Sequence, residues 1–441
     1  MKYQELRKKY PRFIYEKYSY KISGNSLEIF FNFKIEHFNK LKNLLKGDMN
    51  RRFIEPDIRF KPKVIVKNID KSRIKRVGNS ALNNLIFHIG LMEIPSYWKA
   101  TCSPEIIIKA GPLSKEQIKW WKDLIINGMG QFFYENKINF RKPNFLKISS
   151  INIAQQRSIN VARRRSKRVL VPVGGGKDSI VTLEKMKASK KKIGLFLVNP
   201  GKIKVLKNVV KVSGIKDVIT VERKIDPTLL ELNKKGYLNG HTPFTAVLSF
   251  LSVFCAVLFN YRNIAFSNEK SANEGNVKYL GKVINHQWAR SSEFERKFKI
   301  YCKKYLAKDI NYFSYLRPYT ELEISKMFTK YPKYFSAFSS CNVVVAKKLK
   351  KKWCGNCPKC LFVYAALYPF LEKEQLLKIF GKDIFGNKKL LPIMQDLIGR
   401  GVHKPFECVG TFKESRQAFK LSLEKAKKLG KIPYLLTKFN K

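Results

Sequence analysis

The feature that most constrains the fold of this chain is a glycine-rich turn between an apolar strand and a helix. Residues 169–173 read Val-Leu-Val-Pro-Val, residues 174–179 read Gly-Gly-Gly-Lys-Asp-Ser, and residues 179–187 have a helical pattern. Consecutive glycines let the backbone approach a ligand closely, and the start of a helix carries a partial positive charge. The junction therefore favours an anion, and a phosphate in particular, at the end of the strand.

The elements after this turn alternate between strands and helices. Residues 193–198 and 217–221 are predicted strands, and residues 205–212 between them form a predicted helix. Such alternation predicts a parallel sheet, and open parallel sheets bind ligands beyond the carboxyl ends of their strands. We therefore predict an α/β fold with its ligand-binding turn at residues 174–179.

The first third of the chain has a different pattern. Residues 15–35 alternate as in a β-hairpin with a turn at residues 23–26, residues 81–92 are helical in pattern, and Ser114 is a candidate N-cap. A basic cluster at residues 163–168 marks a boundary. The predicted parts are an N-terminal α+β domain at 1–155, a nucleotide-binding domain at 165–340 and a C-terminal lobe with a cysteine metal knuckle at 341–441.

An uncharged segment at residues 242–261 is long enough to span a bilayer. It opens with Thr242 and Pro243, contains further hydroxyl side chains, and is followed by a predicted strand at residues 263–267. A buried helix of an α/β core explains this pattern better, so we expect no membrane span. The N-terminal sequence has charged residues without a following apolar core, so we expect a cytoplasmic protein.

The charge of the chain is strongly basic. Lys and Arg total 88 against 33 Asp and Glu, which gives a formal net charge of +55. Such a charge suits nucleic-acid binding through phosphate contacts, a polyanionic small substrate, or a proteome rich in lysine. Because the basic residues are spread along the whole chain, we favour the compositional explanation and expect no specific nucleic-acid partner.

A cysteine cluster lies in the last quarter of the chain. Cys354, Cys357 and Cys360 form two successive Cys-x-x-Cys steps, and Cys341 lies upstream. Four thiolates can close a tetrahedral structural zinc site, which leaves no open coordination position. Reduced structural thiols and an iron–sulfur cluster are the alternatives.

The glycine turn has the spacing of neither the ordinary P-loop nor a dinucleotide-binding loop. It resembles the PP-loop of ATP pyrophosphatases, usually Ser-Gly-Gly-x-Asp-Ser, with Gly174 in place of the leading serine. The resemblance implies cleavage of ATP between its α and β phosphates, with Asp178 orienting the loop or placing Mg²⁺. A tight turn without a ligand is the alternative. The residues that would bind ATP are Gly174, Gly175, Gly176, Lys177, Asp178 and Ser179.

Several polar blocks make the resemblance more specific. With the PP-loop they resemble the UDP-N-acetylmuramoyl-L-alanyl-L-glutamate epimerase family over nearly the whole chain. The cysteine cluster is similar to the zinc knuckle of the PP-loop synthase of the deazaguanine pathway. The blocks lie at residues 96–104, 239–244, 267–276, 293–296, 316–318, 353–362 and 403–410.

The family resemblance implies an isomerase of peptidoglycan precursor synthesis. UDP-N-acetylmuramoyl-L-alanyl-L-glutamate, with ATP and Mg²⁺, would give the D-glutamate epimer, AMP and pyrophosphate. Adenylation removes the negative charge beside the α-carbon, so that a base can take the α-proton and an acid can return one to the other face.

The candidate residues for this chemistry fall into two groups. His241, Lys270 and Cys408 are candidates for proton transfer, and His286 is also of suitable type. A hydrogen-bonded core histidine, a buried cysteine and a surface ion pair at Arg317 are the structural alternatives. The candidates for substrate binding are Asn268, Glu269, Asn273, Glu274, Arg317 and His403.

Two other functions fit parts of the sequence. A PP-loop enzyme that modifies tRNA, of the thiolase or ligase type, would explain the basic charge and the metal knuckle. Retention on tRNA that falls steeply with salt would favour it. A non-enzymatic, zinc-bearing nucleotide-binding protein is the second alternative, and the intact Gly-Gly-Lys-Asp-Ser sequence argues against it.

Overall fold

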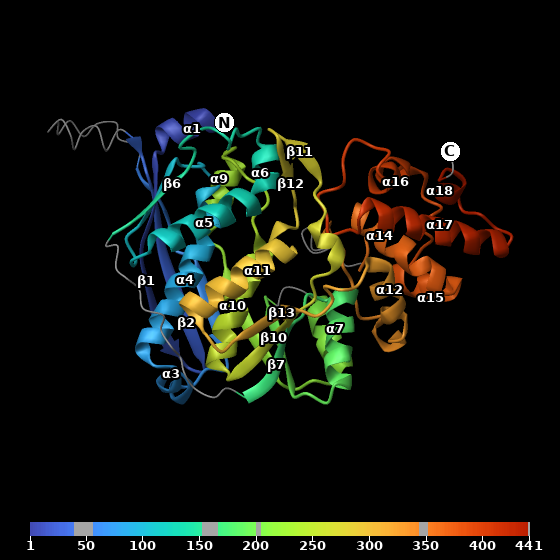
Figure 1. Ribbon diagram of the computed structural model, residues 1–441, viewed down its shortest axis with the longest axis horizontal. Helices are drawn as coiled ribbons and strands as arrows, with labels where there is room; N and C mark the ends of the chain where they lie inside the picture. The colour runs from blue at the N-terminus through green and yellow to red at the C-terminus, as the bar shows by residue number, and fades with distance from the viewer. Residues whose placement is uncertain (39–55, 152–165, 200–203, 344–351, 440–441) are drawn as a thin grey trace.

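The computed structural model describes residues 1–38, 56–151, 166–199, 204–343 and 352–439. Within these ranges an 11-stranded mixed sheet has the order β13-β10-β7-β8-β9-β4-β2-β1-β5-β6, and β3 pairs with β2 (Figure 1). A separate hairpin joins β11 (Val277–Tyr279) to β12 (Lys282–Ile284). The strands of the large sheet are β1 (Arg12–Ser23), β2 (Ser26–Glu36), β3 (Ile58–Phe60), β4 (Lys63–Lys67), β5 (Glu105–Ile108), β6 (Lys147–Ser150), β7 (Ser166–Pro172), β8 (Ile193–Val198), β9 (Val218–Lys224), β10 (Tyr261–Phe266) and β13 (Asn311–Ser314).

Helices cover the sheet and form the C-terminal lobe. They are α1 (Tyr3–Lys9), α3 (Lys71–Val77), α4 (Asn79–Trp98), α5 (Lys115–Gly128), α6 (Gly130–Glu135), α7 (Lys177–Ala188), α8 (Lys204–Ser213), α9 (Pro227–Lys234), α10 (Phe244–Leu258), α11 (Ser292–Tyr301), α12 (Glu321–Thr329), α14 (Pro358–Leu367), α15 (Lys373–Phe380), α16 (Leu391–Ile398), α17 (Phe412–Lys428) and α18 (Tyr434–Thr437).

The half of the sheet that carries the glycine turn is parallel throughout, as the sequence predicts. β13, β10, β7, β8 and β9 pair in parallel, and α7 and α8 connect β7 to β8 and β8 to β9. The predicted turn at residues 174–179 leaves the carboxyl end of β7 and enters α7. The ligand-binding position expected for an open parallel sheet therefore falls on the glycine turn.

The N-terminal segment continues the same sheet. The predicted hairpin is confirmed as β1 and β2, with Ser23 opposite Ser26, and Ser114 caps α5 in a capping box with Gln117. β4 pairs antiparallel with β9, so the N-terminal strands extend the parallel half without a break. The division into three domains stays a prediction, because residues 152–165 at the first boundary lie outside the described ranges.

The basic cluster at residues 163–168 is only partly described. Lys167 and Arg168 belong to β7, which begins at Ser166 and thus earlier than the sequence predicts. The guanidinium of Arg168 donates to the Tyr261 hydroxyl at 2.6 Å. Arg168 therefore helps to join β7 to β10.

The uncharged segment forms α10, a helix of the core. Its side chains from Ala246 to Leu258 are nearly all buried between the sheet and the N-terminal helices. In the described part of the chain, no helix combines the length and the apolar character needed to cross a membrane.

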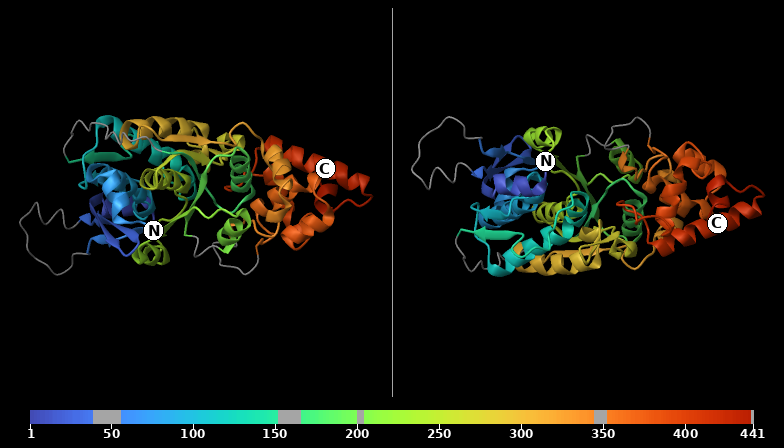
Figure 2. Two further views of the ribbon diagram at one scale, coloured as in Figure 1. Left: turned by 90° about the horizontal axis from the view of Figure 1, so that it is seen from below. Right: turned by 90° about the horizontal axis from the view of Figure 1, so that it is seen from above.

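The C-terminal helices form a lobe at one end of the molecule. Figure 2 shows α14 to α18 at the end opposite the N-terminal strands. Their core includes residues of α7, α12 and α14, which joins the lobe to the helical side of the parallel strands. The lobe consequently lies next to the glycine turn.

Candidate active site

The glycine turn is held by the segment just before Cys341. Gly175 has φ +86°, a conformation that disfavours any other residue, and its carbonyl accepts a hydrogen bond from the Ser339 amide at 3.1 Å. A Cβ on Gly176 would lie 2.6 Å from Ser340 Oγ, whereas one on Gly174 would meet no atom within 4 Å. Two of the glycines are thus required by close packing, and the third faces open space.

A cavity of about 490 Å³ lies at this turn, beyond the end of β7. One wall is apolar and carries Phe196, Val198, Val205 and Leu206. The start of α10 adds Phe244, Thr245 and Leu248 to the lining. The polar side chains of the cavity are Asp178, Ser179, Thr245, Ser267, Asn268, Arg290, Ser339, Ser340, Cys341, Asn342, Lys359 and Cys408.

Lys177 lies beneath the turn and is paired with two carboxylates. Its ammonium group donates to Asp178 Oδ1 at 2.6 Å and to Glu321 Oε2 at the start of α12, and 1% of the Lys177 side chain is exposed. Burial alone would lower the pKa of Lys177, but Asp178 and Glu321 raise it above its ordinary value. Lys177 is therefore charged.

The two carboxylates differ in protonation. Burial would raise the pKa of Asp178, but the charges of Lys177, Lys359 and Arg290 bring it below its ordinary value. Burial raises the pKa of Glu321 to about 7, against the opposing charge of Lys177. Asp178 is thus the carboxylate that keeps its charge, and Glu321 is the one that titrates near neutral pH.

Arg290 is the second cation of the cavity. It belongs to η3 (Trp288–Arg290), pairs with Glu269, and lies 3.9 Å from Asp178 Oδ2. Its Nε is buried without a hydrogen-bond partner among the described residues. Ser267 Oγ, also in the cavity wall, has none there either. These polar atoms suit a ligand with oxygen acceptors.

Arg317 supports this arrangement from behind. Its guanidinium donates to the carbonyl oxygens of Glu269 and Arg290, each at 2.7 Å, and to Glu295 Oε2 at 2.9 Å. These bonds occupy the donors that a substrate carboxylate would need. Arg317 thus fixes the loop that carries Glu269 and Arg290.

The structure brings only some of the predicted site residues to the cavity. Those in its wall include Cys341 and Cys408, the latter from the loop before α17. Of the other predicted residues, Glu274 accepts from the Phe412 amide at 3.0 Å and pairs with Lys404 at 3.1 Å. Those in the wall are Gly174, Gly176, Asp178, Ser179, Asn268, Cys341 and Cys408; those outside it are Gly175, Lys177, His241, Glu269, Lys270, Asn273, Glu274, Arg317, Cys354, Cys357, Cys360 and His403.

The predicted histidines lie in a second cluster beside the Cys408 loop. The rings of His241 and His286 have centroids 4.4 Å apart, and His286 also contacts Phe406. His286 Nδ1 donates to Gln131 Oε1, which leaves the lone pair on Nε2. Burial lowers the pKa of His241 to about 3, with further effects of His286 and Lys99, and lowers that of His286 to about 4.

The four predicted cysteines form one buried cluster. Their sulfur atoms all lie within 4.8 Å of one another, with Cys341–Cys357 at 4.0 Å and Cys354–Cys360 at 3.7 Å. A tetrahedral zinc site with Zn–S bonds of about 2.3 Å has S–S edges of about 3.8 Å. The thiols therefore fit a metal ion of this kind.

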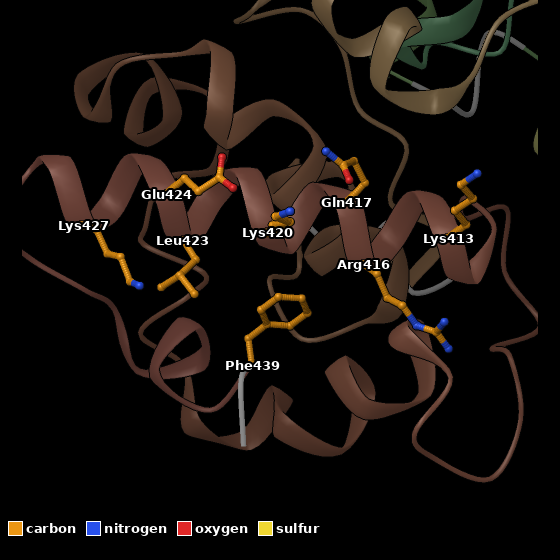
Figure 3. Close-up of a pocket in the computed structure, with 8 residues that line it drawn as sticks. All are labelled: Lys413, Arg416, Gln417, Lys420, Leu423, Glu424, Lys427 and Phe439. Atoms are coloured by element: carbon orange, nitrogen blue, oxygen red, sulfur yellow. The ribbon is translucent and has the colours of Figure 1, made fainter.

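A second hollow, of about 400 Å³, lies on the outer face of α17 (Figure 3). It is lined by basic side chains such as Lys413 and Lys420, with Leu423 and Phe439 as its apolar part. It shares no residue with the cavity at the glycine turn and holds none of the predicted site residues. We therefore place the candidate active site at the glycine turn.

The fold and this cavity define a mixed α/β protein with a charged site at the end of its parallel strands and a cysteine cluster suited to a metal. Family comparison is more specific: residues 7–315 match the MurL N-terminal domain, and residues 337–436 match the MurL C-terminal domain. The chain therefore belongs to the MurL family and is an epimerase, as the sequence predicts.

Curated relatives support the same assignment. The chain is 34% identical over 334 residues, or 75% of this chain and 72% of the relative, to a UDP-N-acetyl-alpha-D-muramoyl-L-alanyl-L-glutamate epimerase of Xanthomonas oryzae pv. oryzae. A protein of the same name from Salinispora tropica is 35% identical over 330 residues, 74% of this chain and 70% of the relative.

Proposed function

We propose that this chain converts the terminal L-glutamate of UDP-N-acetylmuramoyl-L-alanyl-L-glutamate to D-glutamate, for peptidoglycan precursor synthesis. The observation that carries the proposal is the similarity to epimerases named for this substrate, which covers about 70% of their length. The cavity adds support, because its cations, Arg290 and Lys359, suit an anionic substrate.

We further propose that ATP is the co-substrate and that residues 174–179 act as a PP-loop. The amides of the glycine turn and the N-terminus of α7 suit phosphate oxygens, and Phe196, Val198 and Leu206 give an apolar surface for the base. Asp178 supplies the hard oxygen ligand that Mg²⁺ prefers. Ser267 Oγ and Arg290 Nε, both without protein partners in the described ranges, would gain acceptors from the bound nucleotide.

The proposed reaction begins with transfer of AMP to the substrate. A carboxylate oxygen of the glutamate attacks the α-phosphorus of ATP, and pyrophosphate leaves. The resulting anhydride carries no carboxylate charge next to the α-carbon, so that removal of the α-proton leaves an electron pair that the carbonyl can accept. A proton is returned to the opposite face, and water then cleaves the anhydride to the D-glutamate carboxylate and AMP.

For the proton transfers, Cys408 and the histidine pair remain our candidates. Cys408 lies in the cavity wall, and His286 has an available Nε2 lone pair in the adjacent cluster. Lys270 is a weaker candidate, because it is exposed at the start of η2 (Lys270–Asn273) and outside the cavity wall. The cysteine cluster, with zinc bound, would serve the fold rather than the proton transfers.

The test is incubation of the purified protein with ATP, Mg²⁺ and the UDP-muramoyl dipeptide, followed by hydrolysis and chiral analysis of the glutamate, with AMP measured in parallel. D-glutamate formed together with AMP is the expected result. AMP without D-glutamate would contradict the proposed substrate and leave ATP use standing, and tRNA would then be the next acceptor to try. D-glutamate formed without ATP would contradict the adenylation route.

A further inference from the structure

Lys359 is a buried cation in the wall of the cavity that the sequence did not single out. It lies in the first turn of α14, and 5% of the residue is exposed. Within the described part of the chain, its Nζ makes one hydrogen bond, to the carbonyl oxygen of Cys408. An ammonium group has three donors, so two remain for a ligand in the cavity.

Lys177, the lysine of the glycine turn, is in a different situation. Its ammonium group is already bonded to Asp178 and Glu321, and its side chain does not reach the cavity wall. Lys359 lines the cavity together with Asp178, and its positive charge favours the charged forms of Asp178 and Glu321. Lys359 is therefore the lysine that lines the cavity beyond the glycine turn and keeps donors for a ligand.

Lys359 lies between two cysteines of the cluster in the sequence. Cys357 is the N-cap of α14 and Cys360 follows Lys359 directly, so the position of Lys359 is fixed by two members of the cluster. A third member, Cys341, lies two residues after Ser339, whose amide donates to the carbonyl oxygen of Gly175 in the glycine turn. A metal bound by these thiols would fix the position of Lys359 relative to the glycine turn.

We propose that Lys359 is a catalytic residue that binds the phosphates of the nucleotide from the wall of the cavity at the glycine turn, and that the cysteine cluster serves to hold it there. This inference rests on the proposed use of ATP. A preorganised cation in a water-poor site stabilises the negative charge that develops on the phosphates as pyrophosphate leaves. Lys359 thus takes the phosphate-binding task that the sequence assigns to Lys177.

The test compares Lys359→Met and Lys359→Arg with a matched control, Lys382→Met. Lys382 is exposed and packs against Gly355, which lies between Cys354 and Cys357 in the sequence, and it does not line the cavity. For each variant we would measure the affinity for α,β-methylene-ATP with Mg²⁺ by calorimetry, the rate of pyrophosphate release with the UDP-muramoyl dipeptide, and the metal content per chain.

We expect Lys359→Met to weaken α,β-methylene-ATP binding about 10-fold or more, as the loss of a charge-assisted hydrogen bond does. Pyrophosphate release should fall about 100-fold or more, since donors to a developing charge contribute that much. Lys359→Arg should recover part of both, Lys382→Met should change neither, and all three should keep the metal.

Wild-type affinity and pyrophosphate release in Lys359→Met would overturn the inference. So would loss of the metal in that variant, because the lysine would then have a structural role. No binding of the nucleotide by the wild type would instead overturn ATP use itself. Nucleotide binding without D-glutamate formation would contradict only the substrate, and the affinities would still decide the role of Lys359.

Discussion

The ammonium group of Lys177 is paired with the carboxylate of Glu321, although the two residues are 144 positions apart, and only 1% of each side chain is exposed. Asp178 completes the group from the other side. A buried cation with two carboxylates is costly to disturb, because any member left alone is a desolvated charge without a partner. Lys177, Asp178 and Glu321 therefore form one charged unit at the base of the proposed active site, and this unit joins the glycine turn to α12.

The first prediction concerns this unit. Lys177→Met should destabilise the protein by about 3 kcal/mol or more, because it removes the buried cation that is hydrogen-bonded to both Asp178 and Glu321. The measurement is the free energy of unfolding in urea at pH 7.5. Adding Glu321→Gln to Lys177→Met should restore part of the loss, since one of the two carboxylates is then neutral. Equal stability of the wild type and Lys177→Met would contradict the pairing.

The second prediction concerns the glycines. Gly175→Ala should destabilise by about 1–2 kcal/mol, because an L-residue is strained at positive φ, and its Cβ would lie 2.8 Å from Val205 Cγ1. Gly174→Ser should leave the stability unchanged, since a Cβ there meets no atom within 4 Å. The added hydroxyl restores the usual serine of a PP-loop, so α,β-methylene-ATP should bind as tightly as to the wild type or up to about 10-fold tighter.

Thermal unfolding and calorimetry on the two glycine variants check this prediction. If Gly174→Ser bound the nucleotide more weakly at unchanged stability, the open space at residue 174 would not be where the phosphates lie. If Gly175→Ala were as stable as the wild type, the left-handed turn would not be required.

The glycine turn, the parallel sheet and the cysteine cluster could be predicted because each is encoded by adjacent residues. Glu321, Arg290 and Lys359 could not, because each reaches the site from a distant segment through tertiary packing. Weak signals existed: Lys359 lies inside the cysteine motif, and Glu321 follows the helix cap Thr320. Arg317 was predicted as a clamp because of its residue type, but the carbonyl oxygens that occupy it come from two loops.

The sequence pattern also does not predict that the N-terminal strands and the parallel strands form one continuous sheet. The sequence pattern predicts β9 as a strand, but it does not indicate that an N-terminal strand, β4, pairs with it at the edge of the parallel half. Which distant strands become neighbours in a sheet depends on which of their faces are buried together. Because β4 pairs with β9, buried residues of the N-terminal strands and of the parallel strands pack in one hydrophobic core.

The third prediction concerns the metal. Cys354→Ser should weaken metal binding by at least about 100-fold, because even outer-shell partners of a metal contribute 10- to 100-fold. It should also lower the midpoint of thermal unfolding, since a structural metal site contributes to folding. Metal content by mass spectrometry and thermal unfolding are the measurements.

The matched control for the metal is Cys255→Ala. Cys255 is buried in α10 and is not part of the cluster, so this variant should keep the metal and lose about 1 kcal/mol through its small cavity. If Cys354→Ser kept the metal of the wild type, the cluster would not be its ligand set.

The last prediction concerns pH and the histidine pair. His286 has its pKa lowered by burial to about 4, whereas an unfolded histidine titrates near 6.5. Below about pH 6.5 the unfolded state therefore binds a proton that the folded state excludes, so stability is fully present above this pH and is lost as the pH falls towards 4. Between pH 6 and 5 the wild type should lose about 1 kcal/mol of stability per pH unit through His286. The His286→Gln variant should not show this part of the loss.

Urea unfolding of the wild type and His286→Gln between pH 5 and 8 checks this expectation. The difference in stability between the two proteins should be constant above pH 7.5 and should shift in favour of the variant below pH 6.5, since only the wild type must exclude the proton. Groups that face His286 act in both directions: Glu407 and Glu135 raise its pKa, whereas Arg290 and Lys404 lower it. Parallel stability curves over the whole range would mean that His286 binds its proton at the same pH in the folded and unfolded states, so that burial does not lower its pKa.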